Sequence, residues 1–127
     1  MNTAVLDETT RAQIRARLLQ MRREHLAALG RDWVHDEDGA HLPNFADTTD
    51  DEAAVQTLND TARAQAAHDE HGLAAVDAAL ARLPTEEFGL CATCGSPIGA
   101  ARLLAQPTAQ RCVACQTAIE AQQAGAA

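Results

Sequence analysis

The chain contains no lysine and no tyrosine, and only three of its 127 side chains are Phe or Trp. Alanine, in contrast, occurs 29 times. Large apolar side chains are therefore scarce and a thick globular core is not expected, whereas alanine favours helix at little cost per residue. The length suits one compact domain, or a small lobe joined to an elongated helical element.

The sequence also lacks long apolar runs. None approaches the roughly 20 residues that a membrane-spanning helix needs, so we expect no membrane association. The first residues, Met-Asn-Thr-Ala-Val-Leu-Asp, show no basic segment followed by an apolar stretch, which is the pattern of a secretory signal. We therefore expect a cytoplasmic protein, in a compartment where disulfides are rare.

Positive charge is sparse. The net charge is −8, and all ten basic side chains are arginines. A strongly acidic protein is repelled by phosphate backbones unless its bases cluster on one face. Five arginines do gather near the start of the chain: Arg11, Arg15, Arg17, Arg22 and Arg23. Direct sequence-specific binding to nucleic acid is nevertheless not expected, and a basic surface on a larger protein is the better partner.

The four cysteines form two Cys-x-x-Cys pairs, Cys91 with Cys94 and Cys112 with Cys115, separated by seventeen residues. Two such turns can supply four thiolates to a tetrahedral zinc ion, at about 2.3 Å from the metal. The pattern predicts one structural Zn²⁺. Four thiolates close the coordination shell and leave no position for a reactive water, so we do not expect an enzyme.

Three other interpretations of the cysteines are weaker. Disulfides need an oxidising compartment, and a thioredoxin-like redox pair expects a βαβ context that the sequence lacks. Four buried thiols without a ligand are the third. The neighbouring residues favour zinc, because Gly95 can adopt the positive φ of a tight turn round a metal. Cys115 precedes a helix-compatible run over 116–123, whose N-terminal dipole favours a thiolate.

Two long segments have helical periodicity. Residues 7–31 could be capped by Thr9 or Thr10 and end at Gly30, and residues 53–83 end before Pro84. The apolar positions follow spacings of three and four, at Ile14, Leu18, Met21, Leu26, Leu29 and Trp33, and then at Val55, Leu58, Ala62, Leu73, Val76, Leu80 and Leu83. Gly72 lies inside the second segment and is expected to weaken it by about 1 kcal/mol.

These segments predict a mainly α protein with an antiparallel helical hairpin of the coiled-coil type over residues 1–84. Each helix needs the apolar stripe of the other, and the second would be roughly 45 Å long. Residues 85–127 would form a four-cysteine zinc-finger lobe, with one small helical turn or strand pair between the cysteine pairs and a short C-terminal helix. A compact helical bundle is the alternative.

The segment that joins the two helices is acidic. From Asp32 to Ala62 there are nine Asp and Glu residues and no Lys or Arg. We call residues 34–52 the acidic tip. A solvated turn is the plain interpretation, but the tip also contains the apolar run Leu42-Pro43-Asn44-Phe45, part of which could pack on Trp33. Apolar side chains among acids are typical of a contact surface.

Residues 88–116, FGLCATCGSPIGAARLLAQPTAQRCVACQ, resemble the signature of the DksA/TraR family of zinc-finger regulators. The cysteine spacing, Pro97-Ile98-Gly99, Arg102-Leu103 and Pro107-Thr108-Ala109 carry the resemblance, and Asn44-Phe45 before an acidic stretch extends it. The resemblance implies a regulator that binds bacterial RNA polymerase directly. It also implies that the helical hairpin enters the secondary channel, where its acidic tip alters the stability of promoter complexes, often together with ppGpp.

The tip motif of that family is Asp-x-x-Asp-x-Ala, and two alignments are open. Aligned from Asn44-Phe45, the motif falls on Asp47 and Asp50 with Glu52 at the Ala position. Aligned backwards from Cys91, it falls on Asp51 and Ala53 with Thr48 at the first Asp position. We favour Asp47 and Asp50 as the polymerase contacts, with Asp51 and Ala53 as the other candidates. The motif is incomplete in both alignments.

The resemblance also implies basic side chains near the base of the hairpin where ppGpp is used. From Ala64 to Ala81 the chain has no Arg or Lys, which leaves Arg82. A pyrophosphate-rich ligand needs several charge-assisted contacts, so we expect weak or absent ppGpp dependence. We expect a monomer. A zinc-dependent thiol redox sensor and a non-regulatory zinc-module paralogue are the alternative functions, and polymerase binding separates the first of them from the regulator.

Overall fold

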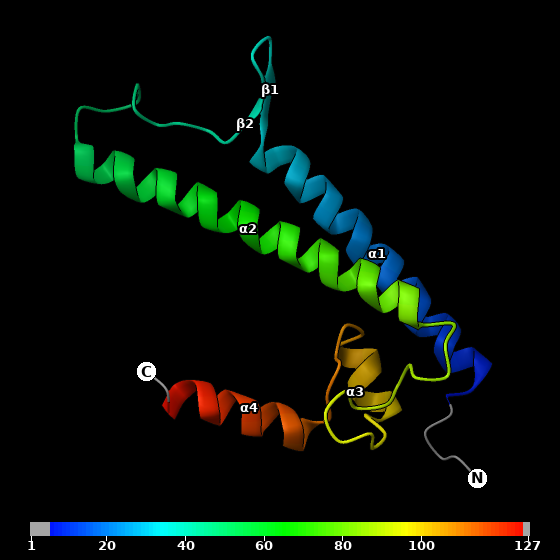
Figure 1. Cartoon of the computed structure of the whole chain (residues 1–127). Helices are drawn as coiled ribbons and strands as arrows, with labels where there is room; N and C mark the ends of the chain where they lie inside the picture. The colour runs from blue at the N-terminus through cyan, green and yellow to red at the C-terminus, as the bar shows by residue number, and fades with distance from the viewer. Residues whose placement is uncertain (1–5, 126–127) are drawn as a thin grey trace. The chain divides into compact units, whose positions relative to one another are not determined.

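The computed structural model describes residues 6–125, and helices dominate this part of the chain. The elements follow in the order α1 (Glu8–Asp32), β1 (Val34–Asp36), β2 (Gly39–His41), α2 (Glu52–Arg82), α3 (Ala100–Ala105) and α4 (Val113–Gly125). The predicted fold class is confirmed. α1 and α2 form the helical hairpin, α3 is the small helical turn between the cysteine pairs, and α4 is the C-terminal helix (Figure 1).

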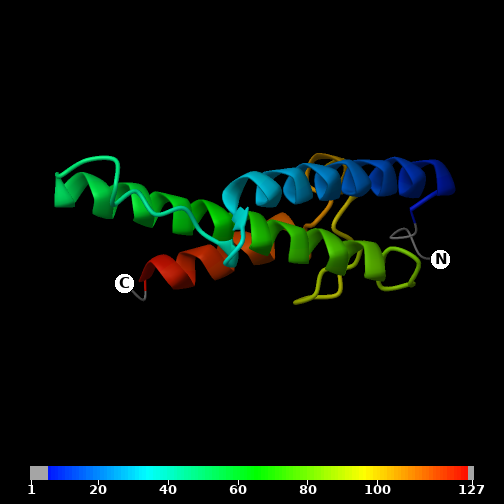
Figure 2. The same cartoon turned by 90° about the horizontal axis from the view of Figure 1, so that it is seen from above.

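The chain divides into two compact units, which are described one at a time. The cysteine unit comprises Met1–Gln20 and Val76–Ala127, and the hairpin unit comprises Met21–Ala75. Both units contain part of α1 and part of α2. In the hairpin unit the two helices run antiparallel and side by side, in agreement between the two views (Figures 1 and 2). The predicted division between residues 84 and 85 stays a prediction.

The two long helices begin at aspartates. The backbone N–H of Thr10 donates to Asp7 Oδ1 at 2.6 Å, and the N–H groups of Ala53 and Ala54 donate to Asp51 Oδ1 at 3.0 and 3.2 Å. These carboxylates satisfy N–H groups that have no partner within the helix. The expectation that Thr9 or Thr10 caps the first helix is therefore wrong.

The ends of the helices also have local causes. α1 continues through Gly30 to Asp32, because a single glycine costs a helix only about 1 kcal/mol. Pro84 follows the end of α2, as predicted. The carbonyl of Arg82 there accepts hydrogen bonds from the backbone N–H and the hydroxyl of Thr85, at 2.8 and 2.6 Å.

The cysteine unit contains the apolar core. Ile14 and Leu18 of α1 are fully buried, and so are Val76 and Ala79 of α2. The other buried apolar side chains come from the end of α2 and from the segment that holds the cysteines: Leu83, Phe88, Leu103, Pro107 and Ala109. Arg11 of α1 joins these parts, since its guanidinium donates to the carbonyl of Leu83 and lies 5.8 Å from the centroid of the Phe88 ring.

The hairpin unit is packed in a different way. The predicted apolar residues Leu26 and Leu58 are 43% and 42% exposed, whereas Ala66 and Asp69 of α2 are buried. Small side chains let two helices approach closely, but they bury little apolar area. Polar contacts between α1 and α2 therefore matter more here than in the cysteine unit.

Asp69 is the centre of these polar contacts. Its carboxylate accepts a hydrogen bond from Gln65 Nε2 at 3.1 Å and lies 3.4 Å from Nδ1 of His25 in α1. The bond from Gln65 is the largest cause of a lowered pKa at Asp69. Asp32, at the end of α1, faces Asp69, and burial together with this second carboxylate raises the pKa of Asp32. A proton on Asp32 removes the repulsion between two carboxylates that are taken out of water.

The acidic tip contains a β-hairpin that the sequence analysis missed. β1 and β2 pair antiparallel, with Val34 opposite His41 and Asp36 opposite Gly39. Gly39 has φ +104°, which only glycine adopts easily. The rest of the tip runs along the first turns of α2 back to its start (Figure 1). The side chain of Asn59 in α2 holds it there, since Asn59 Oδ1 accepts from the N–H of Phe45 at 2.9 Å.

No helix within residues 6–125 has both the length and the apolar character that crossing a bilayer requires.

Gly72 of α2 lies directly beneath the ring of His25. A Cβ atom at this position would come within 2.6 Å of His25 Nε2, which is closer than real Cβ contacts allow. The Gly72→Ala variant gains helix propensity worth about 1 kcal/mol, but it displaces the ring from Asp69. We expect its free energy of unfolding to fall by about 1–2 kcal/mol, because overpacking outweighs propensity. Urea unfolding followed by circular dichroism measures this change.

Gly30→Ala is the matched control, because nothing lies within 4 Å of a Cβ at that position. This variant should be neutral or more stable by up to about 1 kcal/mol. The double variant His25→Ala with Gly72→Ala should regain stability relative to Gly72→Ala alone. Stabilisation by Gly72→Ala itself would contradict the close approach of the ring.

Candidate zinc centre and acidic tip

The first cysteine pair lies in a tight turn. An isolated antiparallel bridge joins Leu90 to Pro97, and the N–H of Cys91 donates to the carbonyl of Ser96 at 2.7 Å. The N–H of Gly95 returns to the carbonyl of Cys91 at 2.9 Å, and Gly95 has φ +77°. The predicted role of Gly95 is therefore confirmed: a residue with a side chain would be strained at this φ.

The turn directs N–H groups towards a sulfur atom. The backbone N–H groups of Thr93 and Cys94 donate to Cys91 Sγ at 3.4 and 3.5 Å. These donors, with that of Cys94 the strongest, lower the pKa of Cys91 to about 6, because they stabilise the thiolate. A hydrogen bond from Ser96 is the main cause of a lowered pKa at Cys94. The first pair is thus prepared to bind a cation as thiolates.

The second pair lies at the start of α4. Cys112 precedes the helix, and Cys115 lies in its first turn. Two hydrogen bonds tie the two pairs together: Ala92 N–H donates to the Gln110 carbonyl at 2.8 Å, and Arg111 Nε donates to Thr93 Oγ1 at 3.1 Å. A third, from Arg102 Nε to the Arg111 carbonyl at 3.0 Å, joins α3 to the residue before Cys112. The spacing of the cysteines gave no indication of the two arginine contacts.

The four cysteine sulfurs converge. The Sγ atoms of Cys91, Cys94, Cys112 and Cys115 all lie within 4.8 Å of one another, and those of Cys94 and Cys112 are 3.9 Å apart. Four sulfurs at about 2.3 Å from a zinc ion stand about 3.8 Å from each other, as tetrahedral geometry requires. The donor set is composed of soft sulfurs alone, which suits zinc better than magnesium or calcium. The arrangement therefore fits a structural zinc.

Crowding of the sulfurs affects Cys115 most. Its hydrogen bond to Cys112, followed by those to the other two cysteines, raises the pKa of Cys115 to about 12. Neighbouring thiolates disfavour a further negative charge, and a divalent cation at the centre removes this penalty. The cluster as a whole is a site that needs a cation before all four sulfurs can ionise.

The candidate contact residues of the acidic tip are exposed. Asp47 and Asp50 lie in the loop before α2, Asp51 caps α2, and Ala53 lies in its first turn. Asp50 also lines a surface groove of about 630 Å³, together with Glu52, Asp60 and Arg63. One acid from the loop and two from α2 thus lie beside one arginine in this groove, and Asp51 caps α2. Whether any of these residues contacts a partner stays a prediction.

Internal hydrogen bonds shape the loop that carries Asp47. The N–H and the hydroxyl of Thr48 donate to the carbonyl of Phe45 at 3.1 and 2.7 Å, and Asn44 Oδ1 accepts from the N–H of Ala46 at 3.0 Å. Asn44 and Phe45 therefore position the acids, which is a role that the sequence analysis did not assign. The sequence signal for this role was the Asn44-Phe45 pair, which precedes the acidic stretch in the family resemblance.

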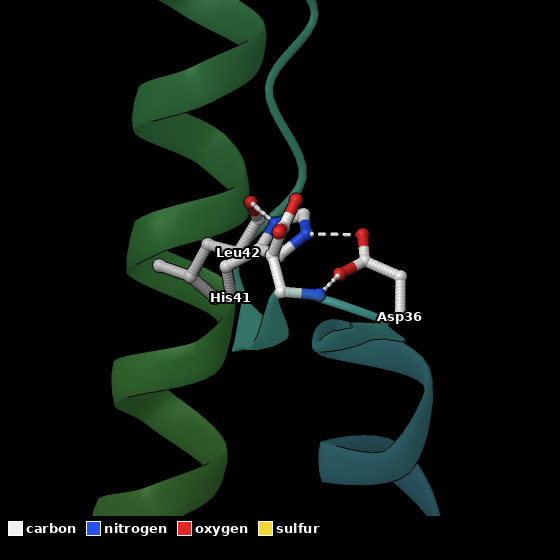
Figure 3. Close-up of polar contacts among 4 residues, drawn as sticks. Asp36, His41 and Leu42 are labelled. Carbon is white, nitrogen blue, oxygen red and sulfur yellow. Dashed lines mark hydrogen bonds and ion pairs between the residues drawn. The ribbon is translucent and has the colours of Figure 1, made fainter.

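The β-hairpin of the acidic tip contains a polar triad (Figure 3). His41 of β2 contacts Asp36 of β1 through Nε2 at 2.8 Å and the carbonyl of Leu42 through Nδ1 at 3.0 Å. The second carboxylate oxygen of Asp36 accepts from the N–H of Asp38 in the turn at 2.9 Å. An Asp-Gly pair at 38–39 was the sequence signal for this hairpin.

Comparison with known proteins agrees with this site. Residues 86–121 match the sequence profile described as a prokaryotic dksA/traR C4-type zinc finger. Over 45 residues the chain is 47% identical to the "RNA polymerase-binding transcription factor DksA" of Haemophilus influenzae and 42% identical to that of Escherichia coli K12. Each match covers 35% of this chain, and it covers 31% and 30% of the two relatives. The match therefore spans about a third of these relatives.

A solved structure matches the fold over nearly the whole chain. The structure of transcription factor DksA2 from Pseudomonas aeruginosa superposes with a TM-score of 0.71 and 24% identity, over 97% of this chain and 92% of that one. The profile and the cysteine cluster define a C4-type zinc-finger protein. Within that class the zinc finger over residues 86–121 is of the dksA/traR type, which agrees with the resemblance of residues 88–116.

Removal of one sulfur tests the zinc centre. Structural zinc contributes on the order of 10 kcal/mol of apparent binding free energy, more than a small lobe obtains from its own core. We expect Cys91→Ser to lose zinc on dialysis and to unfold the segment that holds the cysteines, with a lower melting temperature. Ala92→Ser adds the same hydroxyl at an exposed neighbour and should retain both zinc and stability. Zinc content by atomic absorption, with melting by circular dichroism, measures both. Full stability of Cys91→Ser would refute a structural role.

Proposed function

We propose that the protein is a regulator of bacterial transcription that binds RNA polymerase directly. One observation carries this proposal: a DksA/TraR zinc finger is joined to a helical hairpin with an exposed acidic loop, in a fold shared with DksA2 along nearly the whole chain. The curated relatives that match the zinc finger are named for binding RNA polymerase.

In this proposal the helical hairpin enters the secondary channel of the polymerase. Two helices side by side are roughly 20 Å across, and the 31 residues of α2 extend about 46 Å, dimensions that suit a channel. The acids at Asp47 and Asp50 would then approach a basic, metal-containing active centre, where negative charge is favoured. The protein would change the stability of promoter complexes by binding some states of the polymerase more tightly than others, with no catalytic step of its own.

The cysteine cluster would hold one structural zinc through Cys91, Cys94, Cys112 and Cys115. With four thiolates bound, the metal has no open position for water or substrate, and its contribution is to fix the cysteine segment. We further propose that the protein acts as a monomer in the cytoplasm and that it does not read a DNA sequence directly.

A zinc-dependent redox sensor is the second candidate function. It is favoured by the exposure of Cys94 and by the distance of 3.9 Å between Cys94 Sγ and Cys112 Sγ. A peroxide could take two electrons from these thiolates, leaving a disulfide, and the metal would lose two of its ligands. Release of zinc by peroxide, in a protein that does not bind polymerase, would support this function over the first. A paralogue that binds polymerase without regulating it is the third reading, since Glu52 stands at the Ala position of the tip motif.

Neutralising the tip tests the leading proposal. The variant Asp47→Asn with Asp50→Asn leaves the cap at Asp51 intact, so α2 should remain folded. We expect this variant to bind zinc-loaded core polymerase in a pull-down within about threefold of wild type, and to lose its effect on promoter-complex lifetime in a transcription assay.

The matched control is Glu86→Gln with Glu87→Gln, which removes the same charge from two exposed residues outside the tip. This control should regulate like the wild type. Absence of polymerase binding by the wild type would overturn the proposed function, whereas equal regulation by both variants would overturn the role of Asp47 and Asp50.

Independence from ppGpp is a further expectation. α2 has no Arg or Lys between Ala64 and Ala81, so a pyrophosphate-rich ligand would find few charge-assisted donors there. We expect the change in transcript yield caused by the protein to be the same with and without ppGpp. Polymerase with ppGpp alone is the control for direct effects of the nucleotide. Strong synergy would contradict this expectation.

A further inference from the structure

The contacts of His41 require a charged ring. The carbonyl of Leu42 can only accept a hydrogen bond, so Nδ1, at 3.0 Å, must carry a proton. Asp36 already accepts from the N–H of Asp38, and as a carboxylate it accepts at its other oxygen as well, so Nε2, at 2.8 Å, must also carry a proton. A neutral imidazole has one N–H and satisfies one of these two contacts. The full arrangement in Figure 3 therefore needs the imidazolium.

Histidines are the only possible source of positive side-chain charge in residues 32–62. Between Asp32 and Ala62 there is no Lys or Arg, and His35 and His41 are the only side chains that can become cationic. The ring faces two carboxylates, Asp36 across the strand pair and Asp38 in the turn, and both favour its charged form. The charge on His35 of β1 also contributes to the lowered pKa of Asp36.

We propose that the β-hairpin of the acidic tip is a proton-dependent element, closed while His41 is an imidazolium and loosened when the ring loses its proton. The two contacts of the ring link three parts of the tip: β1 through Asp36, β2 through His41 itself, and the first residue of the following loop through the carbonyl of Leu42. Loss of the proton breaks one of these links. Since the same loop carries Asp47 and Asp50, the protonation of one ring affects how the loop leaves the hairpin.

The direction of the pH dependence follows from the two partners. The hydrogen bond to Asp36, followed by that to Leu42, raises the pKa of His41 above its usual 6.5. Its stabilisation of the hairpin is thus complete below pH 6.5 and is lost as the pH rises through the raised pKa. The hydrogen bond with His41 lowers the pKa of Asp36 from its usual 3.8, so that contribution is lost only as the pH falls through the lowered value. The hairpin is closed between these two limits.

The test needs no polymerase, so its outcome is separate from that of the proposed function. The pKa values of the five histidines are measured by NMR titration of the full zinc-loaded chain. We expect His41 of the wild type to titrate above its usual value of 6.5. Cross-strand contacts between Val34 and His41 should disappear over the same pH range. The variant Asp36→Asn should lower the pKa of His41 relative to the wild type, because it removes the carboxylate partner of the ring.

Asp60→Asn is the matched control, because it removes one exposed carboxylate of the hairpin unit that pairs with Arg63. It should leave the titration of His41 unchanged. His41→Gln should lack the cross-strand contacts at every pH while the helices persist by circular dichroism. The proposal is overturned if His41 titrates at the same pH in the wild type and in Asp36→Asn, or if the cross-strand contacts persist after His41 has lost its proton.

Discussion

Convergence of four sulfurs within 4.8 Å is the constraint on which the cysteine unit depends. Four thiolates at such distances repel one another, and no arrangement of backbone donors can offset this without a cation. The surrounding structure is organised to bring them there. The bridge from Leu90 to Pro97 closes the first turn, Arg111 ties it to the second, and Arg102 of α3 binds the carbonyl of Arg111. α4 begins at the second pair. An apolar core of few large side chains suffices because metal binding would contribute the remaining folding free energy of this unit.

The hairpin unit relies on another kind of cohesion. Its large apolar side chains at Leu26 and Leu58 are well exposed, and the buried positions are taken by Ala66 and Asp69. Here α1 and α2 are joined through His25, Gln65 and Asp69, with the ring of His25 resting on Gly72. The acidic tip continues this pattern with Asn59, Asn44 and the Asp36–His41 pair. Hydrogen bonds set the details of the hairpin unit, while apolar burial sets those of the cysteine unit.

Sequence alone predicted the elements whose cause is local and strong. The cysteine spacing, the helical periodicity before Pro84 and the glycine at position 95 each restrict the chain by sterics or ligand chemistry. The errors arose where competing local signals were of similar size. Asp7, rather than Thr9 or Thr10, caps α1, and Gly30 does not end the helix. The β-hairpin was missed because its strands have three residues each, too few for periodicity to show. The burial of Asp69 could not be foreseen, because it depends on contacts with residues of α1 that are distant from it in the sequence, such as His25.

Buried Asp69 also selects which registry the two helices adopt. A slide of α2 by one helical turn would move this carboxylate away from His25 and leave Gln65, which lies on the same helix, as its remaining partner, so the contact between the two helices would be lost. The same slide would put a residue with a Cβ where Gly72 now admits the His25 ring. Alanine-rich faces would otherwise tolerate several registries with similar energies, since small side chains interlock weakly. One aspartate and one glycine thus favour a single register of α1 against α2, because they destabilise the other registers.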